Sequence, residues 1–181
     1  MHFIASRTKN YADKRELMNM VNELLGIQYN IAKANRTDRK VQNLASYINE
    51  DTLRAIHKTM EKKKAYGIDK VTKEGYEKNL EENLTNLVKR MKSGSYRPNP
   101  TRRVYIPKET KGKMRPLGIS CYEDKLVENV IAQILEQIYE PKFYNESFGF
   151  RPNRNCHQAV REIIEMVQYR KTNYVVEADI R

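Results

Sequence analysis

Hydrophobic residues recur at helical spacing through the first third of the chain. Between residues 14 and 60, apolar side chains return every three or four positions, as one buried face of a helix requires. These positions are Leu17, Met18, Val21, Leu24 and Leu25, followed less regularly by Leu44, Ile48, Leu53 and Ile56. The polar sequence KANRTDRK (33–40) interrupts the pattern. Two or three helices are therefore predicted here.

A further helix is predicted over EGYEKNLEENLTNLVKRMKSG (74–94). Acidic residues lie early in this stretch and basic residues late, the order that the helix dipole favours. Gly94 supplies a C-terminal stop, and the turn-forming sequence KKKAYGIDKVT (62–72) precedes the stretch. The apolar positions that share one face are Tyr76, Leu80, Leu84, Leu87, Val88 and Met91.

Strand-like alternation replaces the helical period in RRVYIPKETKGKMRPLGI (102–119). Apolar and polar residues alternate up to ETKG (109–112), which has the composition of a turn, and the chain then returns. This pattern predicts a two-stranded hairpin. Pro107 and Pro116 suit strand ends or an edge strand, because proline cannot donate a hydrogen bond to a neighbouring strand.

The remaining residues predict two helices and a strand. Ser120 and Glu123 have the spacing of a capping box, and Asn155 and Gln158 can open a second helix. TNYVVEADI (172–180) is rich in β-branched residues and predicts a buried strand. The apolar stripes of the helices are Leu126, Val127, Val130, Ile131, Ile134, Leu135 and Ile138, then Ala159, Val160, Ile163, Ile164 and Val167. The order of elements is that of an α+β fold.

Composition adds a strong positive charge to this picture. The 181 residues contain 34 Lys and Arg against 23 Asp and Glu, a net charge of +11. Such an excess favours a polyanionic partner, most often nucleic acid, over a basic protein without one. Cys121 and Cys156 are expected to be free, buried thiols rather than a disulfide or a zinc site. The start of the chain is unlike a signal peptide, and no stretch approaches the ~18 apolar residues of a membrane span. A cytoplasmic protein with no membrane contact is predicted.

Most of the net positive charge lies in residues 86–116. Ten Lys and Arg residues stand against one Glu there, with Tyr96 and Tyr105 among them. Cations interleaved with aromatic rings are typical of proteins that bind single-stranded nucleic acid, although a solvated surface would have a similar composition. Lys108 and Arg115 flank the turn of the predicted hairpin. A point charge and a bidentate donor in this arrangement could close over a triphosphate.

The hairpin sequence YRPNPTRRVYIPKETKGKMRPLGIS (96–120) resembles the first fingers motif of group II intron-encoded reverse transcriptases. YEPKFYNESFGFRPNRNCHQAV (139–160) is similar to the next block of that family. KAYGIDKVT (64–72) is similar to the loop before the fingers motif, and VVEADI (175–180) to the start of the palm motif. Four blocks in the family's order, over about residues 50–181, make the resemblance specific.

The resemblance implies a right-hand polymerase fold, with helices around a basic β-hairpin. Residues 1–50 would be a helical extension, residues 51–170 the fingers and residues 171–181 the start of the palm. It also implies RNA-templated DNA synthesis from a primer and deoxynucleoside triphosphates, with Mg²⁺ or Mn²⁺ as cofactor. A maturase role on group II intron RNA belongs to the same expectation. Retron and phage-defence enzymes share these motifs without introns.

By position, the resemblance implies roles for individual residues. Lys108 and Arg115 resemble the residues that hold the incoming triphosphate. Asp179 resembles the first catalytic, metal-binding carboxylate, with the carbonyl group of Ile180 as a further ligand. Arg151 belongs to a block near the template and nucleotide, and a role in tying fingers to palm fits it equally well. The other residues expected to contact template RNA are Lys62, Lys63, Lys64, Arg102, Arg103, Lys111 and Lys113.

Some features of the family are missing from this sequence. The palm motif does not continue with its usual aromatic residues and second Asp, and there is no Y-x-D-D sequence. The nearest string, YEDK (122–125), lies at a predicted helix start and has one Asp too few. Lys70 stands where the family often has Gly. Because one carboxylate cannot hold two metal ions, these 181 residues alone are expected to be inactive, as the N-terminal part of a longer polymerase. The alternative is a non-catalytic RNA-binding module, and the reading frame beyond Arg181 would discriminate between the two.

Overall fold

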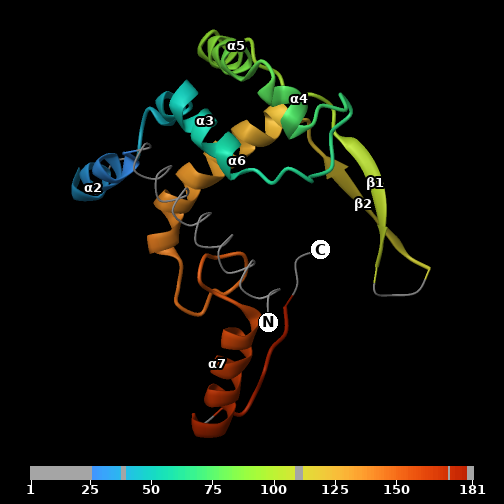
Figure 1. Ribbon diagram of the computed structural model, residues 1–181. Helices are drawn as coiled ribbons and strands as arrows, with labels where there is room; N and C mark the ends of the chain where they lie inside the picture. Colours follow the sequence, from blue (N-terminus) through green and yellow to red (C-terminus); the bar gives the residue numbers. More distant parts are fainter. Residues whose placement is uncertain (1–25, 38–39, 109–111, 171, 179–181) are drawn as a thin grey trace, which may run out of the picture. The chain divides into compact units, whose positions relative to one another are not determined.

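The computed structural model describes residues 26–37, 40–108, 112–170 and 172–178 (Figure 1). The chain divides into two compact units, Met1–Gln137 and Ile138–Arg181. The first unit contains helices and one two-stranded antiparallel sheet, and the second is helical with long connecting segments. This is the mixed helix and sheet content of an α+β protein. The boundaries predicted after residues 50 and 170 stay predictions.

Within the described residues, five helical segments precede the sheet. They are α2 (Ile27–Thr37), the 3₁₀ helix η1 (Leu44–Tyr47), α3 (Glu50–Thr59), α4 (Lys73–Glu77) and α5 (Leu80–Lys92). The predicted polar break at 33–40 is wrong in part, because α2 continues through Lys33 to Thr37. Ile27 and Ala34, seven positions apart, are both buried, so two helical turns share one buried side although polar residues such as Asn30 and Lys33 lie between them. The stripe predicted over residues 17–25 lies outside the described residues.

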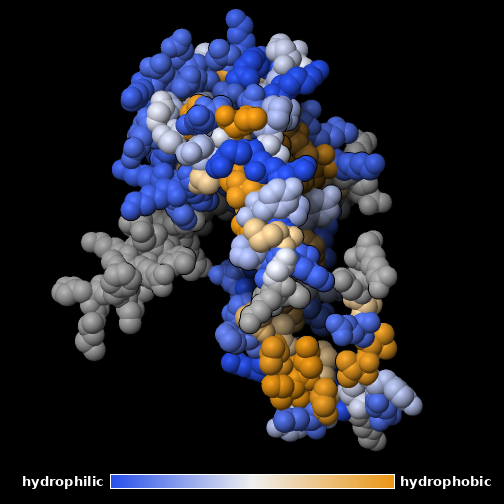
Figure 2. All heavy atoms as spheres, turned by 90° about the vertical axis from the view of Figure 1, so that its right-hand side faces the viewer, coloured by the Kyte–Doolittle hydropathy of each residue, from blue (hydrophilic) through white to orange (hydrophobic). Residues whose placement is uncertain are grey.

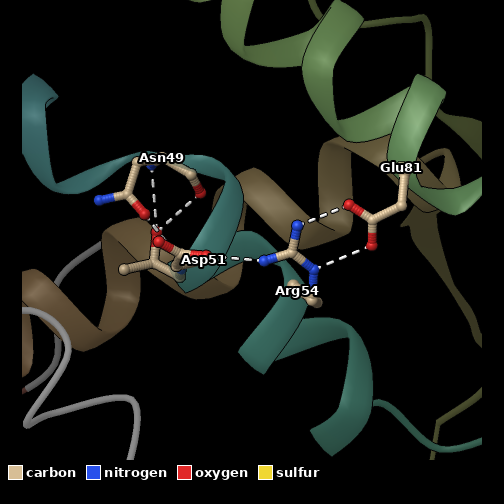
Figure 3. Close-up of polar contacts among 5 residues, drawn as sticks. Asn49, Asp51, Arg54 and Glu81 are labelled. Carbon is tan, nitrogen blue, oxygen red and sulfur yellow. Dashed lines mark hydrogen bonds and ion pairs between the residues drawn. The ribbon is translucent and has the colours of Figure 1, made fainter.

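Helix α3 begins at a capping box and is tied to α5 by an arginine (Figure 3). The backbone N–H of Thr52 donates to Asn49 Oδ1 at 3.0 Å, and the N–H of Asn49 donates to Thr52 Oγ1 at 3.1 Å. Arg54 donates to both carboxylate oxygens of Glu81, at 2.9 and 2.6 Å, and to Asp51 at 2.7 Å. The hydrogen bonds from Arg54 lower the pKa of Glu81. Exposed pairs of this kind add only a modest stabilisation.

The single helix predicted over 74–94 is in fact two helices. Lys78 and Asn79 separate α4 from α5, and Asn79 has non-helical angles of φ −126° and ψ 40°. The side-chain amide of Asn83 donates to the carbonyl of Tyr76 at 3.1 Å, which satisfies a carbonyl that the break removes from the helical pattern. The predicted end at Gly94 is confirmed, since this residue has φ +69°.

The core of the first unit contains apolar side chains from four helices and one aromatic cluster. Its fully buried members are Ile27, Leu53, Ile56, Leu84, Leu87, Leu126 and Val130. The rings of His57, Tyr76 and Tyr122 lie together, with centroids 5.1–6.4 Å apart. His57 Nδ1 is hydrogen-bonded to the Tyr122 hydroxyl at 2.9 Å. Nε2 of the same ring is buried and has no partner in the part of the chain that the structure describes.

The predicted hairpin is confirmed as strands β1 (Arg102–Pro107) and β2 (Met114–Ile119). They pair antiparallel, from Arg102 opposite Ile119 to Pro107 opposite Met114. Pro116 lies in the middle of β2, opposite Tyr105. It is tolerated there because both strands of a two-stranded sheet are edges, so a proline can face away from the ladder.

Helix α6 (Tyr122–Tyr139) does not begin with the predicted capping box. Its first intrahelical bond runs from the N–H of Lys125 to the carbonyl of Cys121, so Cys121 rather than Ser120 is the N-cap. Ser120 Oγ instead donates to Glu128 at 2.7 Å, and Glu123 accepts a hydrogen bond from Arg90. These more distant partners replace the local cap. The stripe is buried only in part, because Ile131 and Leu135 are 41% and 42% exposed.

In the second unit, the predicted start of α7 (Cys156–Tyr169) is confirmed. Asn155 and Gln158 form the reciprocal bonds of a capping box, at 3.0 and 2.9 Å. The apolar stripe of α7 is not buried: its side chains gather as a hydrophobic surface near the bottom of Figure 2. The exposed members are Val160, Ile163, Ile164 and Val167, at 48–58%. The short helix η2 (Glu140–Lys142), which contains Pro141, follows α6.

Two further expectations are wrong. Residues 172–178 do not form the predicted buried strand, and Tyr174, Val175 and Val176 are 80–89% exposed. A strand needs a neighbour to receive its backbone hydrogen bonds, and the only described sheet is β1–β2. Both cysteines are free, but only Cys121 is buried, whereas Cys156 is exposed.

Among the described helices, none has the length and apolar character needed to cross a membrane.

Candidate nucleic-acid interface

The side chains of the hairpin are divided between its two faces. Residues directly opposite in the register, such as Ile106 and Arg115, lie on the same face, and successive residues of a strand alternate. The N–H of Lys108 donates to the carbonyl of Lys113 at 2.8 Å, which extends the pairing towards the turn. Lys108, Lys113 and Arg115 therefore share one face near the tip. We call them the tip cations.

The tip cations are available to a ligand. All three are exposed, and their side chains have no ion-pair or hydrogen-bond partner among the described residues. Lysine contributes a compact charge, whereas the arginine fork can make two parallel bonds to a phosphate. The arrangement can thus hold a polyphosphate chain. Gly112, with φ +81°, lies in the turn, and Lys111 lies outside the described residues.

The opposite face of the hairpin combines a cation with an aromatic ring. Arg103 and Tyr105 lie there by the same alternation, both exposed, with Tyr105 at 56%. Tyr105 stands opposite Pro116 and Arg103 opposite Gly118, so no bulky side chain across the ladder covers them. A ring that can stack on a base beside a charge that can meet a phosphate is the pattern of single-strand binding surfaces.

Arg102 differs from its neighbour Arg103, although both were expected to contact template RNA. The guanidinium of Arg102 lies 4.8 Å from the centroid of the Tyr66 ring. Its Nε and Nη2 donate to the carbonyl of Tyr66 at 3.1 and 2.9 Å. Arg102 therefore joins the base of the hairpin to the loop of residues 61–72, and its predicted contact with RNA stays a prediction.

This loop is docked closely against the start of α6. Lys125 Nζ donates to the carbonyl of Ala65 at 2.5 Å. Gly67 approaches Cys121 so closely that a Cβ atom on it would lie 2.6 Å from Cys121 Cα. The predicted RNA-contacting residues Lys62, Lys63 and Lys64 are exposed at the beginning of the loop.

Lys70 explains one departure from the family pattern. It stands where the resembled family often has glycine, and its φ is +59°. This left-handed region is the one that glycine adopts without a steric cost. The loop therefore keeps the glycine-type backbone conformation although the residue is a lysine.

Arg151 lies in the second unit, with every guanidinium nitrogen hydrogen-bonded. Nε and Nη2 donate to the Glu140 carboxylate, with a shortest distance of 2.8 Å. Nη1 donates to the carbonyls of Tyr144 and Ser147 at 2.7 and 2.8 Å, and the Phe143 ring lies 5.2 Å away. The bonds from Arg151 lower the pKa of Glu140. Arg151 thus closes the segment between Glu140 and Ser147, and its predicted template contact remains untested.

The predicted metal ligands Asp179 and Ile180 lie outside the described residues. Within the described ranges, no group of three or more His, Cys, Asp or Glu side chains could hold a metal ion.

Sequence reasoning missed the polar network at the start of α6. Asp124, only 2% exposed, accepts a hydrogen bond from the hydroxyl of Tyr96 and another from the N–H of Asn99 at 3.0 Å. The sequence carried one signal for it: Tyr122 and Asp124 stand directly before the buried stripe that starts at Leu126. The capping-box pattern obscured this signal, because it assigned Glu123 to a cap at the start of the helix.

Comparisons with known proteins match this part of the chain to one family. Residues 106–181 match the family described as "Reverse transcriptase (RNA-dependent DNA polymerase)". Group II intron-encoded protein LtrA of Lactococcus lactis subsp. cremoris is 44% identical over 101 residues, which are 56% of this chain and 16% of that protein. The expected resemblance is thus confirmed over about half of the chain.

Other relatives extend the same picture. Protein YkfC of Escherichia coli strain K12 is 38% identical over 117 residues, 63% of this chain and 30% of that protein. Nuclear intron maturase 1, mitochondrial, of Arabidopsis thaliana is 35% identical over 95 residues, 44% of this chain and 13% of that protein. The chain spans less than a third of the length of each of these relatives.

Proposed function

From this kinship with the group II intron-encoded reverse transcriptases, we propose that the chain forms the fingers and the start of the palm of an RNA-directed DNA polymerase. The observation that carries the proposal is the placement of Lys108, Lys113 and Arg115 on one face of the hairpin. Two of these three cations are the residues that the resemblance assigns to the incoming triphosphate. The matched region begins at residue 106, so it includes all three.

In this proposal the tip cations bind and orient a deoxynucleoside triphosphate. Their positive charge offsets the charge of the phosphates and the charge that develops on the transferred phosphoryl group. Arg115 fixes orientation through its planar fork, whereas the two lysines contribute charge without a fixed direction. A base for the attacking hydroxyl group is not assigned.

The opposite face and the loop would contact nucleic acid. Arg103 and Tyr105 offer a phosphate contact and a stacking platform, and Lys62, Lys63 and Lys64 add charge. The proposed ligands are an RNA template paired with a DNA primer, and group II intron RNA for a maturase role. Lys111, Lys113, Arg102 and Arg151 remain proposed template contacts on the basis of the resemblance.

The proposal also includes a metal site. Reverse transcriptases generally use divalent metal ions. The assignment of Asp179 and the Ile180 carbonyl as ligands of Mg²⁺ or Mn²⁺ rests on the resemblance. Asp179 would supply the anionic oxygen that such hard cations prefer.

The proposal is tested first by RNA binding. Fluorescence anisotropy of a labelled single-stranded RNA, measured over a range of salt concentrations, gives the slope of log affinity against log salt. Each phosphate neutralised contributes about 0.7 to this slope for single strands. Changing Arg103 and Lys113 to Gln should lower the slope by up to about 1.4. The matched control changes Lys40 and Lys78, two exposed lysines outside residues 86–116, to Gln. Equal slopes for both pairs would place binding elsewhere.

Primer extension separates the polymerase from the RNA-binding module. The 181 residues include no adjacent pair of aspartates to complement Asp179. Extension of oligo(dT) on poly(rA) by these residues should therefore be absent with Mg²⁺ and with Mn²⁺. Robust metal-dependent extension would contradict the expected inactivity.

In a longer protein that contains this chain and extends primers, Asp179→Asn should abolish synthesis and leave RNA binding in place. If no longer protein that contains this chain extends primers, the non-catalytic RNA-binding module is favoured.

A further inference from the structure

Four consecutive side chains at the start of α6 bind four different parts of the first unit. We call Tyr122, Glu123, Asp124 and Lys125 the junction. The Tyr122 hydroxyl is bonded to His57 in α3, and Lys125 Nζ donates to the carbonyl of Ala65 in the loop of residues 61–72. Glu123 and Asp124 bind the other two parts, as described below. No helix-capping role accounts for these bonds, since each reaches a segment at least 25 positions away in the sequence.

Glu123 joins the junction to α4 and α5. It accepts a hydrogen bond from Arg90 Nη2 at 2.5 Å and one from the Tyr76 hydroxyl at 3.3 Å. Arg90 in turn lies 5.8 Å from the centroid of the Tyr96 ring. Burial and the negative charge of Glu123 both raise the pKa of Tyr76, so its hydroxyl keeps the proton that it donates. These hydrogen bonds from α4 and α5 therefore hold the junction in place.

Asp124 holds the segment that leads into the hairpin. Its Oδ1 accepts from the Tyr96 hydroxyl, and its Oδ2 accepts from the N–H of Asn99 at 3.0 Å. The side chain is almost completely buried, and a buried carboxylate is costly unless such bonds satisfy it. Asn99 lies three residues before β1, and β2 ends three residues before Tyr122. Both ends of the hairpin therefore meet at the junction.

The direction in which the hairpin points depends on how its two ends are held at the junction. An isolated two-stranded ribbon is marginally stable, and β2 is exposed along Met114–Gly118. The strand from Arg102 to the tip is about 20 Å long at ~3.3 Å per residue. A tilt of about 10° at the base would displace the tip by about 3 Å on that length. Errors of this size are large for a site that must align two reacting groups.

We propose that the junction is a positioning device that fixes the basic hairpin relative to the loop of residues 61–72, with Asp124 as its central positioning residue. The inference rests on the proposed function, because it concerns how the two parts meet one RNA strand. Asp124 does not touch the ligand. It acts through Tyr96 and Asn99, while Lys125 holds the loop at the adjacent position.

The test uses the whole chain and two conservative substitutions. Asp124→Asn keeps the shape of the side chain but places an amide donor where two donors already converge, and Tyr96→Phe removes one of these donors. Each should raise the Kd for a single-stranded RNA that spans loop and hairpin by about tenfold. The double variant should be no weaker than Asp124→Asn alone, because both changes act through one interaction. Inorganic tripolyphosphate, which is short enough to meet only the tip cations, should bind all variants equally.

A control variant separates positioning from general destabilisation. Arg54→Gln removes the bonds that join α3 to α5 (Figure 3), away from the junction. It should lower the melting temperature without changing the RNA Kd of the folded protein. If Arg54→Gln weakens RNA binding as much as Tyr96→Phe does, or if neither junction variant changes the Kd, the positioning role is wrong.

Hydrogen exchange gives a readout that does not need RNA. In Tyr96→Phe and Asp124→Asn, amides of residues 102–119 and 61–72 should exchange faster, while those of α5 keep their protection. Unchanged exchange of the hairpin would overturn the proposal even if RNA binding were altered. If instead the wild-type protein bound no RNA through the hairpin, the proposed function would fail. The exchange result would still decide whether the junction holds the hairpin.

Discussion

At the scale of single residues, Gly67 shows how one missing side chain joins two segments. A Cβ atom at this position would lie 2.6 Å from Cys121 Cα and 2.8 Å from Cys121 N. These are backbone atoms at the start of α6, so they cannot move aside as the end of a flexible side chain can. Glycine at position 67 is therefore required by the close approach of the loop, and the composition of a turn is only part of the reason for it.

Gly67→Ala should accordingly destabilise the protein. Overpacking of this kind typically costs about 1–3 kcal/mol, measured as the change in the free energy of unfolding in urea. Gly149→Ala is the matched control, because a Cβ atom there meets no other atom within 4 Å. Equal stability of Gly67→Ala and Gly149→Ala would mean that the loop does not pack against Cys121 as described.

The cations of the candidate interface also differ from one another at this scale. Arg102 and Arg103 are identical in type and adjacent in sequence, yet Arg102 is bonded to Tyr66 and Arg103 is exposed without a described partner. The sequence could place both on the hairpin. It could not separate them, because the difference depends on a loop 36 positions away.

At the scale of elements, the sequence predicted those features that depend on nearby residues. The hairpin and the capping box at Asn155 follow from local turn and capping chemistry, and both are confirmed. The grouping of Lys108 and Arg115 beside one turn was predicted, whereas their common face required the register. The partners in the capping box are three positions apart, and the paired residues of the hairpin are 7 to 17 positions apart.

Features that depend on distant partners could not be predicted in this way. Ser120 and Glu123 match a capping box, but Glu128 and Arg90 bind them instead. The β-branched run at 175–176 has strand propensity, which becomes a strand only when a neighbour receives its hydrogen bonds. The junction combines both problems, because its partners lie on four segments far apart in the sequence.

The capped start of α7 offers a prediction at the element scale. Asn155→Ala removes the side-chain acceptor for the N–H of Gln158 at the start of α7, and such losses cost about 1 kcal/mol. Asn79→Ala is the control, because Asn79 precedes α5 in the same position but makes no side-chain cap bond. Far-UV circular dichroism during urea unfolding should show a loss of stability for the first variant only. A similar loss for both would contradict the assigned cap.

At the scale of the whole molecule, the exposed positive charges and the buried polar groups lie in different places. Much of the charge lies on exposed surfaces of the hairpin and the loop, where it can meet a polyanion. The interior holds neutral or paired groups, such as Asp124 with its two donors. His57 is also buried, and one of its ring nitrogens has no partner among the described residues. The protonation of His57 should therefore be coupled to the stability of the first unit.

We expect stability to fall as the pH falls below about 6.5, the ordinary pKa of histidine. Burial, and then the positive charge of Lys73, lower the pKa of His57, while Glu77 opposes them. The Tyr76 and Tyr122 rings that also face it stay neutral, because burial raises the pKa of each. The unfolded chain therefore binds a proton that the folded protein rejects. This contribution to stability is complete above the unfolded pKa and is lost as pH falls through the folded one. The pKa values of the Glu81 and Glu140 carboxylates are also lowered, but these groups affect the stability only below about pH 4.5.

Urea unfolding at pH 7.5 and pH 5.5 tests this expectation, because the lowered carboxylates do not titrate between these values. Wild-type protein should be less stable at pH 5.5. His57→Gln should be less stable than wild type at pH 7.5, since it loses ring packing and the bond to Tyr122, but it should change little between the two pH values. His157→Gln is the control: His157 is exposed, so that variant should keep the wild-type pH dependence. If the dependence survived in His57→Gln, another group would have to be responsible, and the buried imidazole would be protonated as readily in the folded protein as in the unfolded chain.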